Sequence, residues 1–594
     1  MLALWFGTWT GITLFSAHLA ARALRGRAVH IDPQFVWMAP ASNIILFVCV
    51  ALVLIGLGIR WNRVRSQAVV LGAFFSLAVF SGALLYPRIN RWALLVLCIG
   101  VGIQFGRLTA PRLDRLMPWI RRSLVGGLAL VAVMTTFVNV RIVLRDRANI
   151  AALRTPPADA PNVLLIILDT VRALNLGLHG YDRPTSPFLD ELAGRGVVFE
   201  AAFVSAPWTL TSHGTMFTGR WPFELTASWE QPLDDSHPVI AEALTARGYT
   251  TAGFVANDPF GRDIYGLGRG FLHYSGWPRT FGTMMEMSPV VRFAIDNYNR
   301  LSNSHYTPER RTADDIAREF QRWRSGVDGR PWFAFLNLFD AHEPYDPPSP
   351  WDTRFGEPQH RRIGTELPSP QLARDLTDGY DGGIAYMDHV LRATFDALDA
   401  DGSLENTLVI ITSDHGELLG ERNLLDHGNS LYTPLLHVPL LMAWPGRMPQ
   451  GMRIDHAVSL RDLPATIAAL TPADASFPGR PLSRLWSGPP PAGPDTIYAA
   501  VEFAPRQPPW YPLAKGDMRS VIVWPWHYIV NGDGSEELYD LSADPAETGP
   551  PISEPAVLAR MRDVMATFPT YVRAQQCEAS TSASATAAAA GGDC

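Results

Sequence analysis

Apolar residues dominate five stretches within the first 150 residues of the chain, and short loops that carry arginine separate these stretches. Most of them approach the roughly 20 residues that a helix needs to cross a bilayer. A cleaved signal peptide does not describe the first stretch, because no basic segment precedes it and four further apolar stretches follow it. The pattern predicts five membrane-spanning helices, with four as the fallback because the fourth stretch is short, at residues 2–21, 43–59, 68–86, 92–105 and 123–144.

The arginines of the connecting loops indicate the orientation of these helices. With five spans, the loops on the side of the N-terminus hold Arg60, Arg63, Arg65, Arg107, Arg112, Arg115, Arg121 and Arg122. The loops on the other side hold Arg22, Arg25, Arg27, Arg88 and Arg91, and further arginines follow the fifth span. Because basic loops tend to stay in the cytoplasm, this modest bias favours an N-terminus inside the cell and a long C-terminal part outside the cytoplasm.

Farther along the chain, two apolar runs end abruptly in polar residues. The run at 163–168 is too short for a helix and too apolar for a half-exposed strand, and Asp169 follows it directly. A second run, at 408–411, ends shortly before Asp414 and His415. Buried parallel strands deliver such residues to the crevice at the carboxyl ends of an α/β sheet. The pattern therefore predicts an α/β fold that brings these polar side chains together.

The same residues have the chemistry of a metal site, since carboxylate oxygens and an imidazole nitrogen bind Zn, Mn, Mg or Ca. Between the two strands, Thr209 lies in the loop PWTLTSH, just ahead of a stretch that can begin a helix. A cation and a helix N-terminus would both favour an alkoxide and an anionic substrate at this hydroxyl. The alternative is that Asp169, Asp414 and His415 only cap helices after the strands. The occurrence of the whole set favours the metal site.

Further landmarks occur in the order typical of the sulfatase family within the alkaline phosphatase superfamily. They are the strand end at Asp169, HGYDRPTSPFLDELAGRGVVF at 179–199, the loop at 209–213, DAHEPY at 340–345, YDGGIAYMDHVL at 380–391, SDHGE at 413–417, DHGNSLYTPLLHVPLLMAWPG at 426–446 and ELYDLSADPAE at 537–547. The segment from 161 to about 544 therefore resembles this family. The resemblance implies an alkaline phosphatase-like α/β/α sandwich with a smaller C-terminal subdomain.

The chain departs from the family at the nucleophile. Sulfatases carry C-x-P-S-R, or Ser in place of Cys, and the first residue is oxidised to formylglycine. Thr209 stands at that position, and the four cysteines of the chain, at 49, 98, 577 and 594, lie elsewhere. An unmodified threonine resembles the nucleophile of lipoteichoic acid synthase, phosphoethanolamine transferases and nucleotide phosphodiesterases. Thr170 replaces the family's second Asp, so the implied ligands of a single cation are Asp169, Thr209, Asp414 and His415.

Histidines stand where the family has basic residues around the anion. Lys515 is the only lysine of the chain, so the lysines that contact sulfate in the family have no counterpart. His213 and His427 replace the family's loop arginine and later lysine, and His342 matches a family histidine. Because imidazole donates hydrogen bonds and moves protons near neutral pH, we expect these three histidines to contact substrate and to act in catalysis. Arg220 is a further candidate for substrate binding.

The chain of 594 residues is long enough for a membrane part and a large soluble domain, and its net charge of −7 does not suggest nucleic-acid binding. We expect a transmembrane domain at 1–147, a linker at 148–160, a catalytic domain at 161–550 with a C-terminal subdomain from about 450, and a terminal helix with a disordered tail at 551–594.

Together these features predict a membrane-bound hydrolase or transferase that acts on phospho-esters, or sulfo-esters, of cell-envelope lipids or glycans with one divalent cation (Mn, Zn, Ca or Mg). The resemblance to five-span enzymes implies the cytoplasmic membrane of a bacterium, with membrane lipids as partners and the catalytic domain outside the cytoplasm. Two alternatives stay open: a sulfatase without formylglycine, and an inactive envelope scaffold. Retention of a complete ligand set argues against the scaffold.

Overall fold

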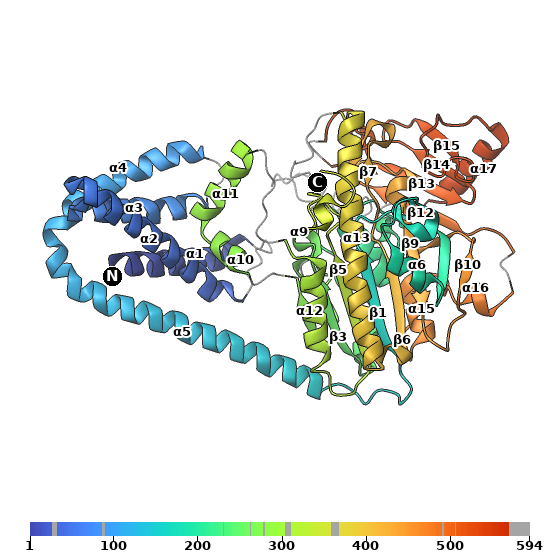
Figure 1. Ribbon diagram of the computed structural model, residues 1–594, viewed down its shortest axis with the longest axis horizontal. Helices are drawn as coiled ribbons and strands as arrows, with labels where there is room; N and C mark the ends of the chain where they lie inside the picture. Colours follow the sequence, from blue (N-terminus) through green and yellow to red (C-terminus); the bar gives the residue numbers. More distant parts are fainter. Residues whose placement is uncertain are drawn as a thin grey trace, which may run out of the picture. The chain divides into compact units, whose positions relative to one another are not determined.

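The computed structural model describes residues 1–25, 33–85, 89–229, 231–261, 263–276, 280–302, 310–357, 367–473, 475–489, 492–504 and 507–568. The chain divides into two compact units (Figure 1). The first contains Met1–Asn149 and Trp277–Glu309, and the second contains Ile150–Gly276 and Arg310–Cys594. The chain therefore enters the second unit, returns to the first for one segment, and then completes the second.

The N-terminal part of the first unit is helical. Its helices are α1 (Leu2–Arg25), α2 (Phe35–Arg60), α3 (Gln67–Ala83), α4 (Arg91–Thr109) and α5 (Leu113–Ala151). In the described part of the chain, two segments, Phe35–Arg60 and Arg91–Ala151, are long and apolar enough to cross a membrane by length and composition. The structure thus gives two candidate spans where the pattern predicts five, because α3 is short, α1 carries several polar residues, and a 3₁₀ turn joins α4 to α5.

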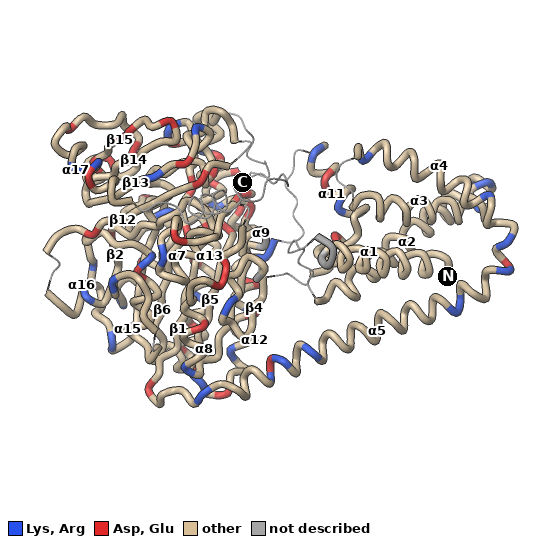
Figure 2. Tube along the Cα trace, turned by 180° about the vertical axis from the view of Figure 1, so that it is seen from behind, with Lys and Arg blue, Asp and Glu red and all other residues tan. Residues whose placement is uncertain are grey.

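Charged residues of these helices gather near the helix ends, and the middles of α1 to α4 are free of them (Figure 2). Such helices can place an apolar length in a bilayer and their charges at its surfaces. The last helix, α5, continues to Ala151, so the predicted linker at 148–160 begins too early. Its polar C-terminal turns extend the helix past the apolar stretch that predicted it.

Two helices from far along the sequence complete the first unit. They are α10 (Phe281–Glu286), which packs against α2, and α11 (Pro289–Ser302), which packs against α3. The sequence analysis places both inside the catalytic domain, and this placement is wrong. Apolar side chains of α10 are buried against α2 rather than in the core of the second unit.

The second unit is built on a nine-stranded mixed sheet with the order β10-β2-β9-β6-β1-β5-β3-β4, in which β11 also pairs with β2. The strands are β1 (Asn162–Leu168), β2 (Val197–Phe203), β3 (Thr250–Val255), β4 (His273–Ser275), β5 (Trp332–Leu338), β6 (Thr407–Thr412), β9 (His437–Ala443), β10 (Met452–Ile454) and β11 (Val458–Ser459). The four central strands β6, β1, β5 and β3 are parallel, and β9 runs antiparallel to β6. The carboxyl ends of the four parallel strands therefore meet at one edge of the sheet.

Helices lie along both faces of this sheet (Figure 1). They are α6 (Pro187–Ala193), α7 (Thr209–Thr218), α8 (Ile240–Ala246), α9 (Asp258–Gly261), α12 (Ala313–Arg324), α13 (Pro370–Ala400), α14 (Thr433–Leu436), α15 (Leu463–Leu470) and α16 (Arg484–Ser487). Alternate residues of β1 enter two separate apolar cores: Val163 and Leu165 belong to one, and Leu164 and Ile166 belong to the other. A strand that is buried on both sides reads as a continuous apolar run, which confirms the α/β prediction.

A second sheet closes the unit. It is antiparallel, with the order β12-β13-β14-β15, and consists of β12 (Thr496–Val501), β13 (Met518–Val523), β14 (Trp526–Val530) and β15 (Glu536–Asp540). Helix α17 (Pro555–Ala566) packs on this sheet through Met561. The strands β7 (Leu418–Leu419) and β8 (Leu425–Asp426) pair with each other in a separate two-stranded sheet. The C-terminal subdomain begins later than the predicted 450, because β10 and β11 belong to the large sheet and α15 packs against α7 and α8. The predicted tail beyond 568, with its two cysteines, lies outside the described residues.

Candidate active site

Three predicted ligands meet at the carboxyl ends of two neighbouring strands. β1 pairs in parallel with β6, in a register that sets Ile167 beside Thr412, so the residues that follow both strands emerge together. Asp169, Asp414 and His415 are completely buried. One potential ligand atom from each of them lies within 4.8 Å of the others.

The donor set fits a divalent cation. Among the residues that the structure describes, Oδ1 of Asp169 and Oδ2 of Asp414 are buried without a hydrogen-bond donor. Burial and the nearby Asp414 raise the pKa of Asp169 well above its usual range. Two buried carboxylates with unsatisfied oxygens are unfavourable unless a cation compensates them. The oxygens and one imidazole suit Mn, Zn, Ca or Mg with little discrimination.

His415 is oriented as a neutral ligand. Its Nδ1 lies 2.9 Å from the carbonyl oxygen of Gly416 and donates to it, so Nε2 keeps its lone pair. Nε2 is 3.5 Å from Oδ2 of Asp414. Burial lowers the pKa of His415 to about 4, which favours the neutral form that binds metals.

Thr209 is the first residue of α7, at the positive end of this helix. Its Oγ1 lies 3.4 Å from Nε2 of His415 and accepts a hydrogen bond of 3.1 Å from Nδ2 of Asn257. The hydroxyl is therefore adjacent to the candidate metal ligands and to free backbone N–H groups. This is the arrangement that the sequence predicts for a nucleophile.

Two asparagines at the site were not predicted from the sequence. The side-chain amides of Asn257 and Asn337 each donate to Oδ2 of Asp169, at 2.9 Å. Asn257 follows β3 and Asn337 lies near the end of β5, the two strands that continue the row beyond β1. Their position at strand ends was a usable signal, but neutral amides do not stand out as charged ligands do.

Thr170 has an unusual backbone conformation. Its φ of 64° is left-handed, which is rare for a β-branched residue and indicates a functional constraint. The strained turn directs its backbone N–H to Oδ1 of Asp414, at 3.2 Å. Its hydroxyl bonds to the carbonyl oxygen of Asp169 and does not join the ligands. The carboxylate lost from the family's pattern is thus not replaced by this side chain.

Two further imidazoles continue in a row from the candidate ligand His415. The ring centroid of His427 lies 4.5 Å from that of His415 and 4.9 Å from that of His342. His342 stacks on Phe339 at 4.1 Å in the loop after β5. The structure therefore brings His342 and His427 to the site, as the sequence predicts. Burial, reinforced by the nearby His427, lowers the pKa of His342 well below its usual value.

His427 is held between two carboxylates. Its Nδ1 lies 3.1 Å from Oε1 of Glu417 and 3.1 Å from Oδ1 of Asp426. Burial alone would lower its pKa, but these carboxylates outweigh burial and raise the pKa to about 10. The two carboxylates therefore favour the charged form of His427 near neutral pH. Glu417, inside the SDHGE landmark, was not among the site residues predicted from the sequence.

The structure places His213 and Arg220 differently with respect to the site. His213 is buried one turn into α7, where its Nδ1 lies 2.8 Å from the carbonyl oxygen of Thr209 and its ring packs on Phe217. Arg220 follows the opposite end of α7 and donates to Glu224 at 3.1 Å. Nδ1 of His213 also lies 3.6 Å from Oδ2 of Asp414, so the structure places His213 beside a candidate metal ligand. It does not bring Arg220 to the site, because an adjacent carboxylate pairs with it.

Comparisons with known proteins identify the family to which this unit is similar. A family model described as Sulfatase matches residues 161–473, just over half of the chain. Arylsulfatase K of Rattus norvegicus is 24% identical over 447 residues, which cover 66% of this chain and 75% of that protein. The ulvan-active sulfatase of Formosa agariphila is 23% identical over 421 residues, which cover 66% of this chain and 78% of that protein.

Solved structures share the fold of the second unit. Phosphonate monoester hydrolase of Agrobacterium radiobacter has a TM-score of 0.55 at 21% identity, and the match covers 69% of this chain and 94% of that chain. At such identity the likeness establishes the alkaline phosphatase-like α/β fold. Together with the family match over residues 161–473, it shows that the chain belongs to the sulfatase family of ester hydrolases.

Proposed function

We propose that this protein is a membrane-anchored, metal-dependent enzyme that transfers or hydrolyses phosphoryl groups of cell-envelope lipids or glycans, with Thr209 as its nucleophile. One observation carries the proposal: Oγ1 of Thr209 lies 3.4 Å from Nε2 of His415 at the start of α7. An unmodified alcohol supports phosphoester chemistry, because it cannot become the formylglycine on which sulfatases of this family depend.

Asp169, Asp414, His415 and the hydroxyl of Thr209 are the residues that would hold the cation. When bound, a divalent cation supplies charge stabilisation for the nucleophile and for the oxygens of the reacting group. Asn257 and Asn337 orient the carboxylate of Asp169, and the backbone of Thr170 orients that of Asp414.

The remaining steps use groups of the chain. Oγ1 of Thr209 loses its proton and forms a bond to phosphorus while the bond between phosphorus and the ester oxygen breaks, and the leaving oxygen gains one proton, so that no proton is gained or lost overall. His427, charged between Glu417 and Asp426, donates to a phosphoryl oxygen or supplies the proton of the leaving group. Water or a sugar hydroxyl then removes the group from the threonine. Water gives a hydrolase, and an envelope glycan or lipid gives a transferase.

Membrane anchoring is part of the proposal. It is supported by the two apolar helical segments that are long enough to span and by the arginine bias of the loops. A bacterial cytoplasmic membrane, with the second unit outside the cytoplasm, agrees with the apolar segments and with the arginine bias.

A sulfatase that works without formylglycine is the second candidate, and the family match and the likeness to arylsulfatase K favour it. A panel of aryl phosphate diesters, phosphate monoesters and sulfates, given to the full-length protein with each cation, separates the two. We expect the fastest turnover on a phosphate ester. Turnover of aryl sulfate alone, with phosphate esters inert, would contradict the proposal.

A further inference from the structure

The segment that contains α10 and α11 leaves the catalytic unit and belongs to the membrane unit. It is inserted between β4 and α12, yet it packs with α2 and α3. Met284 and Met287 are buried in one cluster with Phe35 and Met38 of α2. A buried hydrogen bond of 3.3 Å joins the hydroxyl of Ser288 to Oδ1 of Asn43. This combination of apolar and polar contacts fixes α10 on the beginning of α2.

Helix α11 makes a second set of contacts. The ring of Phe293 lies edge-on to Phe80 of α3, at 5.6 Å between centroids, and edge-on to Trp92 of α4, at 5.3 Å. Arg91 forms an ion pair of 2.9 Å with Asp296. These contacts join α11 to the end of α3 and to the beginning of α4.

All of the contacted positions belong to the same end of the helical bundle in a membrane. The beginning of α2, the end of α3 and the beginning of α4 lie on one side of a bilayer when each helix crosses it. The inserted segment connects to the catalytic unit at both of its ends, so this must be the catalytic side. The opposite side then holds Arg60 and Arg107, as the bias of basic loops requires.

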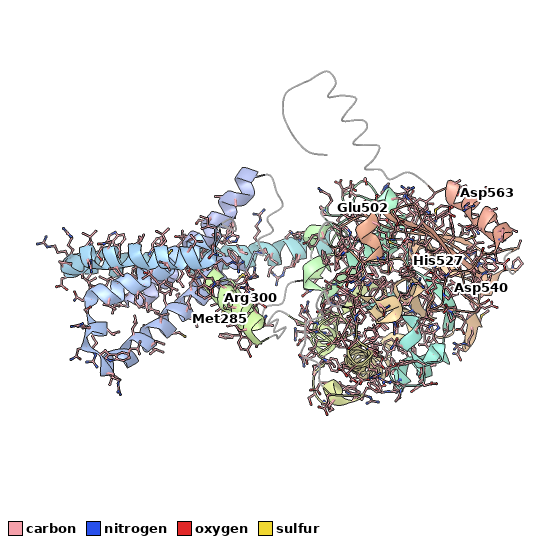
Figure 3. The ribbon with its side chains drawn as sticks, turned by 90° about the horizontal axis from the view of Figure 1, so that it is seen from above. Met285, Arg300, Glu502, His527, Asp540 and Asp563 are labelled. Atoms are coloured by element: carbon pink, nitrogen blue, oxygen red, sulfur yellow. The ribbon has the colours of Figure 1, made fainter. Side chains whose placement is uncertain are left out.

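The free surface of the segment has the composition of a membrane interface. Phe281, Tyr298 and Leu301 are 68%, 60% and 87% exposed. Arg300 lies between Tyr298 and Leu301 in sequence, and it marks α11 in Figure 3, where Met285 marks α10. Aromatic and aliphatic side chains insert at the headgroup level, and arginine pairs with lipid phosphates. Two helices that expose these groups next to membrane-spanning helices suit phospholipid rather than bulk water.

We propose that Phe281–Ser302 is a phospholipid-binding element that lies in the headgroup layer on the catalytic side of the membrane. The inference rests on the membrane location in the proposed function. It gives the catalytic unit a second attachment to the lipid surface, in addition to the covalent link through α5. Its partner is the phosphate and glycerol region of a bilayer.

The first residue that the structure describes after this element, Arg310, contacts the loop that carries His342. Arg310 donates to the carbonyl oxygens of Phe339, Asp340 and His342, each at 3.1 Å, and to that of Pro344. The next residue, Arg311, donates to the carbonyl oxygen of Val255, at the end of β3. The lipid-binding element is therefore joined by sequence to the residue that supports the loop of His342.

Spin labels test the location of α11 in the full-length protein. We would replace the native cysteines by alanine, introduce Tyr298→Cys or Leu301→Cys, and reconstitute each labelled protein into phosphatidylethanolamine–phosphatidylglycerol nanodiscs. The control is Ile552→Cys, whose side chain is exposed on the catalytic unit. We expect the α11 labels to be more accessible to oxygen than to a water-soluble nickel chelate, and the control to show the reverse. An aqueous signature at both α11 sites would overturn the proposal.

An activity measurement distinguishes this proposal from the proposed function. A double variant, Tyr298→Glu with Leu301→Glu, should release phospholipid headgroups about tenfold more slowly in nanodiscs, because charges are costly in the interface. It should hydrolyse a soluble aryl ester at the rate of the unaltered protein. Equal lipid turnover by both proteins would contradict the proposal that this element binds phospholipid. No lipid turnover by the unaltered protein would instead contradict the proposed lipid substrate, and the spin-label result would still decide the location of α11.

Discussion

The hydroxyl of Thr209 lies 3.4 Å from Nε2 of His415, although 206 positions separate them in the sequence. Helix α7 begins at Thr209, and His415 follows the end of β6. A candidate nucleophile and a candidate metal ligand are thus brought together by the start of a helix and the end of a strand.

Asp414→Asn should weaken cation binding by about 100-fold or more, because it removes a negative ligand from a small buried site. Metal content of the purified protein and titration with Mn, Zn, Ca and Mg measure the effect. The matched control is Asp378→Asn, which alters a carboxylate paired with Arg183. Full stoichiometric metal in the Asp414 variant would show that the ligand set is misread.

Asn257→Ala should lower kcat by about 10- to 100-fold, because the amide orients both Asp169 and Thr209. Asn257→Asp should be slower still near neutral pH, since it would set a second carboxylate against Asp169. Steady-state kinetics, with thermal unfolding as the check on folding, provides the test. Asn406→Ala, which alters a single long bond to Ala160, is the control. An aspartate variant as active as the unaltered protein would contradict the assignment.

Glu417→Gln should move the alkaline limb of activity to lower pH. His427 has its pKa raised to about 10, above that of an unfolded chain, so its charge is complete at low pH and is lost as the pH rises through 10. Removing one of the two carboxylates lowers that pKa, and the charged form is lost earlier. A profile of kcat/KM from neutral to strongly alkaline pH measures the shift, with the exposed Glu191→Gln as control. An unchanged alkaline limb would exclude His427 as the charged group.

Much of the second unit could be predicted from sequence. Val163–Leu168 reads as a doubly buried strand because its alternate residues fill two apolar cores, and the polar residue after it then marks the crevice. Asp169, Asp414 and His415 follow from that rule. Asn257 and Asn337 could not be predicted in this way, because amide side chains near strand ends are common. The hydrogen bonds of both amides to one oxygen of Asp169 are visible only in three dimensions.

The misplaced features have physical causes as well. The segment with α10 and α11 carries ordinary amphipathic sequence, and only its burial against Phe35 and Met38 assigns it to the membrane unit. Arg220 is near Thr209 in sequence, but the length of α7 carries it to the far end of the helix, where Glu224 pairs with it. Long-range packing in the first case, and helix geometry in the second, were not readable from local pattern.

Removal of residues 1–155 alone should give a poorly soluble protein. The cut would expose Met284, Met287 and Phe293, which lose their partners on α2, α3 and α4. Replacing 277–309 by a short polar linker in the same protein should restore a monodisperse state. Size-exclusion chromatography and turnover of a soluble aryl ester compare the two proteins. A monodisperse product of the first truncation would show that the contacts of α10 and α11 are dispensable.

The most direct test of the account is the covalent state of Thr209 during turnover. The full-length protein should be mixed with a phosphate ester, quenched within one turnover, digested and analysed by mass spectrometry, beside Thr209→Ala and the same-helix control Thr211→Ala. We predict a phosphoryl group on Thr209, a loss of several orders of magnitude in kcat for Thr209→Ala, and near-normal kcat for Thr211→Ala. Near-normal turnover by Thr209→Ala, or a phosphoryl group on another residue, would contradict the account.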